Sequence, residues 1–213
     1  MEPNSNLDWP NLTRYKNQNF DIPAPQENEK RVVFMGDSIT EEWSKLYPSY
    51  FENRSYINRG IGGQTTPQML IRFKQDVVDL MPTVVVILAG TNDIAGNTGP
   101  SNVKMITDNI FSMATIATAN DIQVVLSSGL PVHRYEWSPE IVDPPSTIDA
   151  LNKCLKEFSE SNGFYYLNYF SEMVDDKKGF NKEYNSDGVH PNEKEYKFMS
   201  TIAEKKLKSI LGY

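Results

Sequence analysis

Short apolar runs alternate with helical patterns along most of the chain. The run at residues 83–90 is apolar along its length, as expected for a parallel strand that is covered on both faces. Strands are predicted at residues 31–35, 56–58, 83–90, 122–128 and 164–168. Apolar residues at spacings of three and four predict helices around residues 103–117 and 148–158 and after Pro191. This alternation favours right-handed crossovers and a parallel sheet in three layers.

The pattern predicts one domain, residues 31–213, preceded by a polar N-terminal arm, residues 1–30, that packs on it. Within the arm, apolar residues at helical spacing follow Asp8, a candidate N-cap, and predict a helix with Pro10 in its first turn. Later in the chain, Ser146 and Asp149 resemble a capping box for the helix around residues 148–158.

Composition narrows the possible partners. The 213 residues carry a formal net charge of −7, and no cluster of Lys or Arg offsets it, so a nucleic-acid partner is not expected. A single cysteine excludes an internal disulfide framework and a multi-cysteine zinc site. No apolar run approaches 18 residues, so no membrane partner is expected. The N-terminus lacks the basic and apolar regions of a secretion signal, so the chain as given is expected to be cytoplasmic, or secreted or periplasmic if a signal peptide was removed.

Polar and glycine-rich segments follow each of the predicted strands. They are GDS at 36–38, NRGIGGQTT at 58–66, GTND at 90–93, SGLPVHRYEW at 128–137 and, further from its strand, SDGVHP at 186–191. Ligands bind at the carboxyl ends of the strands in such sheets. We therefore expect these segments to meet at one edge of the sheet and to form a site there.

The segments contain the groups that nucleophilic catalysis needs. Ser38 becomes a good nucleophile only if a base removes its proton, and histidine is the usual base. The chain has two histidines, His133 and His190, and Asp187 precedes the second by three residues with a glycine between them. A tight turn would let the Asp187 carboxylate orient the His190 ring.

Attack on a carbonyl group also creates an oxyanion, which needs hydrogen-bond donors already in place. A glycine N–H in the segment 58–66, the side-chain amide of Asn92 and the N–H of Ser38 are candidates.

Taken in order, GDSIT at 36–40, GIGGQTT at 60–66, GTND at 90–93 and DGVH at 187–190 resemble the four sequence blocks of the GDSL-type, or SGNH, hydrolases. The resemblance extends over roughly residues 31–210. It implies a flavodoxin-like α/β/α sandwich with a five-stranded parallel sheet, ester hydrolysis, and no cofactor or metal.

The same resemblance assigns roles to individual residues. Ser38 matches the family's nucleophile, and Asp187 and His190 complete its triad. Asn92 and Gly63 match the oxyanion donors beside the Ser38 N–H, with Gly62 as the alternative to Gly63. Gln64 departs from the pattern, because many members have Asp there, and we expect this to alter a loop contact or the pocket rim.

The segment 131–147 is long, rich in proline and aromatic residues, and lacks a helical period. Long loops at the active edge often shape pockets. His133, Arg134, Tyr135 and Trp137 are therefore candidates for substrate binding, the alternative being that they pack the loop onto the surface.

The function that these residues favour is a serine esterase for short-chain carboxylic esters, including acetyl groups on carbohydrates. The alternative is a lysophospholipase or a thioesterase, whose substrates carry longer acyl chains. A metal-dependent hydrolase would instead use Asp37, Asp93, Asp187 and His190, a set that suits Mg or Ca better than zinc. A phosphate or flavin binder is allowed by the fold class but lacks the phosphate-loop sequence.

Overall fold

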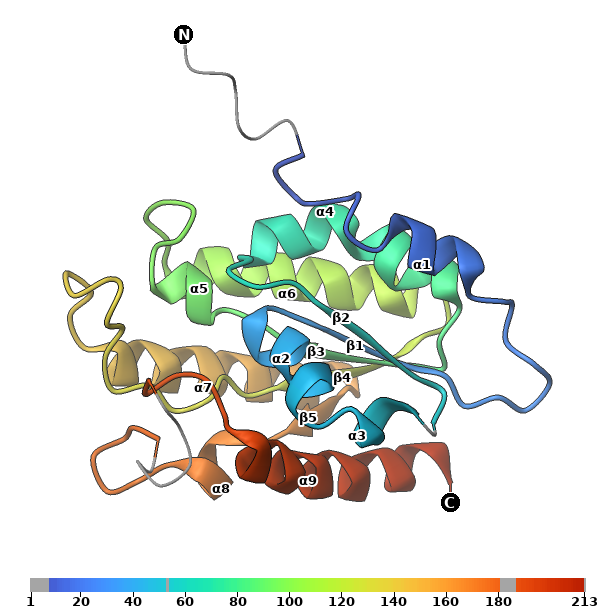
Figure 1. The fold of residues 1–213 in the computed structure, drawn as a ribbon. Coiled ribbons are helices and arrows are strands. Elements are labelled where there is room, and N and C mark those ends of the chain that lie inside the picture. Colours follow the sequence, from blue (N-terminus) through green and yellow to red (C-terminus); the bar gives the residue numbers. More distant parts are fainter. Residues whose placement is uncertain (1–7, 53, 181–186, 213) are drawn as a thin grey trace, which may run out of the picture.

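The computed structural model describes residues 8–52, 54–180 and 187–212 (Figure 1). Five parallel strands form one sheet in the order β2-β1-β3-β4-β5. Their bounds are Val32–Gly36 for β1, Tyr56–Gly60 for β2, Val84–Leu88 for β3, Gln123–Ser127 for β4 and Tyr165–Leu167 for β5. All five predicted strands are present, and β2 extends two residues beyond its predicted end.

Helices cover both faces of the sheet (Figure 1). On one face lie α4 (Thr66–Asp76), α6 (Val103–Thr118) and α7 (Pro144–Asn162), and on the other lie α2 (Ser38–Leu46), α3 (Ser49–Glu52), α8 (Phe170–Met173) and α9 (Glu193–Leu211). The remaining short helices are α1 (Lys16–Asp21), α5 (Thr91–Ile94) and a 3₁₀ turn at Val78–Leu80. Alternate residues of β1 face the two cores, Val33 toward α4 and Phe34 toward α2. The predicted three-layer α/β/α fold is confirmed.

The prediction of a helix that starts at Asp8 is wrong. Residues 8–14 form turns, and the first helix, α1, begins at Lys16. The Asp8 carboxylate accepts hydrogen bonds from the N–H groups of Leu12, at 2.7 Å, and Thr13, at 2.9 Å. An N-cap side chain binds the N–H two or three residues ahead, so these longer-range bonds close a compact turn and do not start a helix.

The start of α7 also differs from its prediction. Its N-cap is Asp143, whose side chain accepts the N–H of Ser146 at 3.2 Å, and Pro144 and Pro145 occupy the first turn. The proposed capping box of Ser146 and Asp149 is therefore wrong. Proline is well suited to the first turn because its missing N–H would be unpaired there, so the two prolines continue into the helix.

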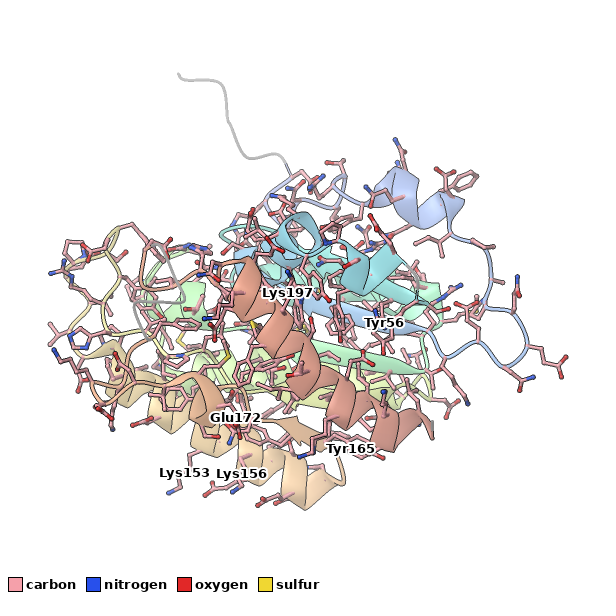
Figure 2. All side chains as sticks on the ribbon, turned by 60° about the horizontal axis from the view of Figure 1, so that its bottom comes forward. Tyr56, Lys153, Lys156, Tyr165, Glu172 and Lys197 are labelled. Atoms are coloured by element: carbon pink, nitrogen blue, oxygen red, sulfur yellow. The ribbon has the colours of Figure 1, made fainter. Side chains whose placement is uncertain are left out.

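Helix α9 holds α2 in place. Figure 2 shows α9 in front of the sheet, with Lys197 in its N-terminal half and Tyr56 beside it. Tyr56 donates to Glu204 in α9 at 2.9 Å, and the Tyr196 hydroxyl donates to the carbonyl of Ile39 in the first turn of α2 at 2.8 Å. Trp43 of α2 stacks against Tyr196 with ring centres 5.7 Å apart. The two contacts of Tyr196 fix α2 against α9, and the bond from Tyr56 to Glu204 fixes α9 against β2.

Within the described ranges, no helix has both the length and the apolar character that crossing a bilayer requires.

Candidate active site

Ser38 lies where β1 passes into α2. It is the first residue of the helix, and the Asp37 side chain caps that helix by accepting the Ile39 N–H at 2.9 Å. Gly36 makes the tight turn possible, because a Cβ on it would lie 2.1 Å from Oγ1 of Thr40. The Ser38 N–H belongs to the first turn, whose N–H groups have no partner within the helix.

His190 brings a base to Ser38 from the segment before α9. Its Nε2 lies 2.9 Å from Oγ of Ser38, and its Nδ1 lies 2.6 Å from Oδ2 of Asp187. The other carboxylate oxygen, Oδ1, accepts the backbone N–H groups of Val189 at 3.0 Å and His190 at 2.8 Å. Ser186, expected at the start of this segment, lies outside the described residues. The three side chains thus form a continuous chain of short contacts.

The charge state of Asp187 determines which ring nitrogen of His190 carries the proton. Partial burial raises the pKa of Asp187, but the hydrogen bonds from His190 and Val189 outweigh this and leave the pKa below its ordinary value. An ionised carboxylate can only accept hydrogen bonds. Nδ1 therefore carries the hydrogen and donates a hydrogen bond to Asp187. The lone pair of Nε2 is free to accept the proton of Ser38.

The loop between β2 and α4 distinguishes the two candidate glycines. The N–H of Gly62 already donates to Oε2 of Glu41 at 2.7 Å. Gly63 adopts a φ of 75°, a conformation that favours glycine. Its N–H has no hydrogen-bond acceptor among the residues that the structure describes. Of the two glycines, Gly63 is therefore the one whose N–H is available to donate a hydrogen bond to a substrate.

Asn92 reaches the same loop from α5, just after β3. Its side chain is buried; Nδ2 donates to the carbonyl of Gln64 at 3.1 Å, and Oδ1 accepts from Nδ2 of Asn97 at 2.9 Å. Nδ2 has two hydrogens, so one remains after the bond to Gln64. Asn97 also donates to the carbonyl of Gly63 at 3.2 Å and thereby connects the two candidate oxyanion donors.

Two buried carboxyl groups flank the site. Burial raises the pKa of Asp37 to about 7, although the Ile39 N–H and the nearby His190 lower it. Burial likewise raises the pKa of Asp93 to about 6, against hydrogen bonds from the hydroxyl and N–H of Thr66. Both groups are thus engaged in holding turns of the backbone.

The four side chains considered as cation ligands, Asp37, Asp93, Asp187 and His190, do not gather into a ligand set. In the part of the chain that the structure describes, no three His, Cys, Asp or Glu side chains stand together as metal ligands would.

The loop after β4 places its four candidate residues differently. Trp137 is 45% exposed, its ring centre lies 6.4 Å from that of His190, and its Nε1 donates to Oδ1 of Asn97 at 3.2 Å. Tyr135, expected to line the site, is instead fully buried, with its hydroxyl 2.9 Å from that of Thr91. Arg134 pairs with Glu136 at 2.6 Å on the surface. Exposed His133 packs beside Gly179, where an added Cβ would lie 2.9 Å from that of His133.

The sequence analysis missed Glu41 and the bridging position of Asn97. Glu41 lies one turn after Ser38 on the same helix, and this spacing of three residues was the available signal. Nothing local to Asn97 indicates that it contacts Asn92, Gly63 and Trp137.

Comparison with known proteins identifies the family of this chain. The sequence model of the GDSL-like lipase/acylhydrolase family matches residues 34–198. The chain belongs to this family. The resemblance to the GDSL-type hydrolases, a family of ester hydrolases, is thereby confirmed.

Solved structures of GDSL-like proteins share the whole fold. A Bacteroides fragilis protein assigned to the acylhydrolases is 45% identical with a TM-score of 0.94, and the match covers 96% of this chain and 99% of that one. A GDSL-like lipase from Bacteroides thetaiotaomicron is 42% identical with a TM-score of 0.93, over 95% and 100% of the two chains. An acetyl xylan esterase, 18% identical with a TM-score of 0.68, covers 82% of this chain and 98% of its own and shares the fold.

Two curated relatives of this GDSL-like chain match over shorter stretches. An uncharacterized lipoprotein from Bacillus subtilis is 28% identical, and the match covers 73% of this chain and 62% of the lipoprotein. The human platelet-activating factor acetylhydrolase IB subunit alpha2 is 32% identical over 71 residues, or 32% of this chain and 31% of that subunit. The chain therefore spans less than two thirds of the length of either relative.

Proposed function

We propose that the protein is a serine esterase in which Ser38 is the nucleophile, His190 the general base and Asp187 the group that orients His190. The observation that carries this proposal is the chain of contacts from Oγ of Ser38 to Nε2 of His190, at 2.9 Å, and from Nδ1 of His190 to Oδ2 of Asp187, at 2.6 Å. A nucleophile, a base and an orienting carboxylate in this order are what acyl transfer by serine requires.

The first half of the reaction forms an acyl-enzyme. Oγ of Ser38 attacks the ester carbonyl carbon while its proton passes to Nε2 of His190. The resulting imidazolium is stabilised by ionised Asp187 and returns the proton to the leaving alcohol as the carbon–oxygen bond breaks. Water then attacks the acyl-enzyme through the same base, which releases the carboxylic acid and restores Ser38.

The oxyanion of each tetrahedral intermediate is stabilised by three donors: the N–H of Ser38, the N–H of Gly63 and the remaining hydrogen of Asn92 Nδ2. Gly63 is favoured over Gly62 because the Gly62 N–H is already donated to Glu41. Asn92 is held at both ends of its amide, by Gln64 and Asn97, so it needs no reorganisation during the reaction.

The substrate class that we propose is short-chain esters, acetyl to butyryl, with acetylated carbohydrates as the favoured natural class. The loops at the active edge carry small and polar side chains, and the exposed ring of Trp137 beside His190 offers a flat face for a sugar ring. The relative named as an acetylhydrolase supports a short acyl group.

Labelling with a fluorophosphonate tests the nucleophile. We expect the unmodified protein to take one label, on Ser38, and Ser38→Ala to lose both the label and ester hydrolysis while keeping its thermal stability. Ser44→Ala is a matched control, because Ser44 lies on the same helix and donates to the Glu41 carbonyl; it should keep label and activity. A label recovered on another serine would overturn the assignment.

A series of esters from C2 to C16 at matched solubility, followed by acetylated sugars, tests the substrate class. We expect kcat/KM to be highest from C2 to C4. A maximum at C8 or longer would replace the proposal by a lysophospholipase or a thioesterase.

A further inference from the structure

The glycine loop, residues 60–65, carries the Gly63 N–H and the carbonyl that holds Asn92. Gly62 and Gly63 are exposed, and a loop of this kind has few contacts of its own to keep it in one conformation. The loop is nevertheless held by hydrogen bonds from outside it, and three of these bonds are at Gly60, Gly62 and Gln64. These three bonds lead, directly or through one side chain, to the arm segment, residues 8–21.

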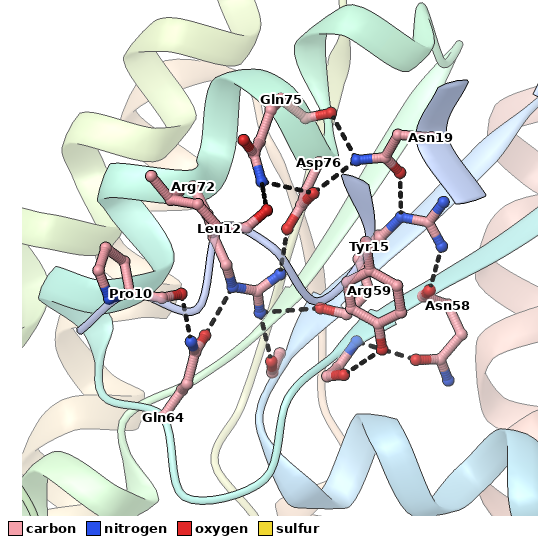
Figure 3. Close-up of polar contacts among 12 residues, drawn as sticks. Pro10, Leu12, Tyr15, Asn19, Asn58, Arg59, Gln64, Arg72, Gln75 and Asp76 are labelled. Carbon is pink, nitrogen blue, oxygen red and sulfur yellow. Dashed lines mark hydrogen bonds and ion pairs between the residues drawn. The ribbon is translucent and has the colours of Figure 1, made fainter. Parts of the chain in front are cut away.

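The first connection is made by Tyr15. Its ring is buried, and its hydroxyl donates to the carbonyl of Gly60 at the start of the loop (Figure 3). The guanidinium carbon of Arg59 lies 4.6 Å from the centre of the ring and fixes the ring from one face.

The second connection passes through Glu41 on α2. Nη2 of Arg14 lies 3.0 Å from Oε1 of Glu41, and the other carboxylate oxygen accepts the N–H of Gly62 at 2.7 Å. Arg14 therefore helps to hold the carboxylate that occupies the Gly62 N–H and leaves Gly63 as the free donor.

The third connection is Gln64, whose buried side chain bridges the arm segment and the sheet (Figure 3). Nε2 donates to the carbonyl of Pro10 at 2.7 Å, and Oε1 accepts from Nε of Arg72 at 2.6 Å. Arg72, itself fully buried, donates to the carbonyls of Gly36 at 3.0 Å and Arg59 at 2.9 Å. The main chain of Gln64 is thus fixed relative to the ends of β1 and β2, and its carbonyl receives Asn92.

We infer that the arm segment is a positioning element for the oxyanion hole and that Gln64 is the residue through which it acts. The inference rests on the proposed function, because it assumes that Gly63 and Asn92 stabilise an oxyanion. A misplacement of about 1 Å in such donors can cost up to about 10²-fold in rate. Loss of the bond from Gln64 to Pro10 should therefore lower kcat and leave substrate binding largely intact.

Gln64→Glu tests this with little change of shape. At pH 8 the carboxylate still accepts from Arg72 but has no hydrogen to donate to Pro10. We expect kcat to fall about 10-fold with KM within about twofold. A double-mutant cycle with Asn92→Ala, which alone should cost about 10²–10³-fold, separates positioning from general damage. If Gln64 acts through the oxyanion hole, its substitution should cost less than about threefold once Asn92 is absent.

Gln75→Ala is the matched control, because Gln75 donates to the arm carbonyl of Leu12 at 2.8 Å and makes no bond to the glycine loop. Its kcat should be unchanged.

Tyr15→Phe removes only the hydroxyl that reaches Gly60, and should lower kcat about threefold. This variant tests the role of the arm segment if Gln64→Glu does not fold. Unchanged kcat in folded Gln64→Glu and Tyr15→Phe, or multiplicative effects in the cycle, would overturn the role of the arm segment. A loss in Gln75→Ala equal to that in Gln64→Glu would overturn Gln64 as the residue through which the arm acts. Fluorophosphonate labelling of Ser38 keeps the two proposals apart: labelled variants with unchanged kcat overturn the arm's role alone, whereas an unlabelled, inactive unmodified protein overturns both.

Discussion

Nδ2 of Asn97 lies 2.9 Å from Oδ1 of Asn92, and this contact fixes which way the Asn92 amide faces. The indole N–H of Trp137 can only donate, so the Asn97 atom 3.2 Å from it must be the oxygen. The nitrogen of Asn97 then faces Asn92, whose facing atom must accept. The Asn92 nitrogen is therefore turned toward the carbonyl of Gln64, which lies 3.1 Å away. An exposed tryptophan thus acts together with the carbonyls of Gln64 and Gly63 to orient the amide of Asn92, the proposed oxyanion donor.

This relay predicts the effect of Asn97→Asp. A carboxylate accepts from Trp137 but cannot donate to Asn92, so two oxygens would face one another and the Asn92 amide would turn or shift. We expect kcat to fall by about 10- to 100-fold, less than for loss of Asn92 itself. Steady-state kinetics on a C2 ester measures this, with Trp137→Phe, which keeps an aromatic ring and removes only the N–H, giving a smaller loss. Equal kcat for Asn97→Asp and the unmodified protein would contradict the relay.

The two histidines should respond differently to substitution. His190→Ala removes the proposed base, whose Nε2 contacts Ser38, and we expect most of the rate to be lost, with a residual of roughly 10³–10⁴-fold over water from binding and the proposed oxyanion donors. His133→Ala, at an exposed position beside Gly179, should change KM more than kcat. Kinetics of both variants on a single ester gives the comparison. The reverse ranking would require a different triad.

Asp37 makes folding stability depend on pH. Burial raises its pKa to about 7 from an ordinary value of 3.8, so between these values the folded protein holds a proton that the unfolded chain has released. The stabilisation is complete below about pH 4 and is lost as pH rises through about 7, with a total on the order of 4 kcal/mol. Asp93, whose pKa is raised to about 6, acts in the same direction.

Asp37→Asn should remove the Asp37 part of this dependence. The amide oxygen can still accept the Ile39 N–H, but the side chain has no proton to lose. We expect the free energy of unfolding of the variant, relative to the unmodified protein, to increase steadily from pH 4 to pH 7 and then to level off. Urea unfolding at several pH values measures the difference. A constant difference across this range would show that Asp37 does not titrate there.

The sequence by itself determined the strands, the parallel three-layer sheet and the edge at which the polar segments meet. These depend on local patterns: apolar runs such as residues 83–90 are buried wherever they lie, and the segments that follow parallel strands come out at one edge. The local reading was wrong where a side chain acts beyond its usual range. Asp8 binds N–H groups four and five residues ahead instead of capping a helix, and Asp143 starts α7 ahead of the expected capping box.

Only the tertiary structure decided which of these groups contact one another. Residues 38 and 190 are 152 positions apart, and the packing of Tyr196 of α9 on the first turn of α2 accompanies the 2.9 Å contact between Ser38 and His190. The difference between Gly62 and Gly63 arises because Glu41 accepts one N–H and not the other. The connection of Gln64 to Pro10 likewise depends on where the arm segment lies. Hydrogen bonds require atoms to come within about 3 Å, and between residues distant in the sequence this separation is set by the packing of whole helices and strands, which no local pattern records.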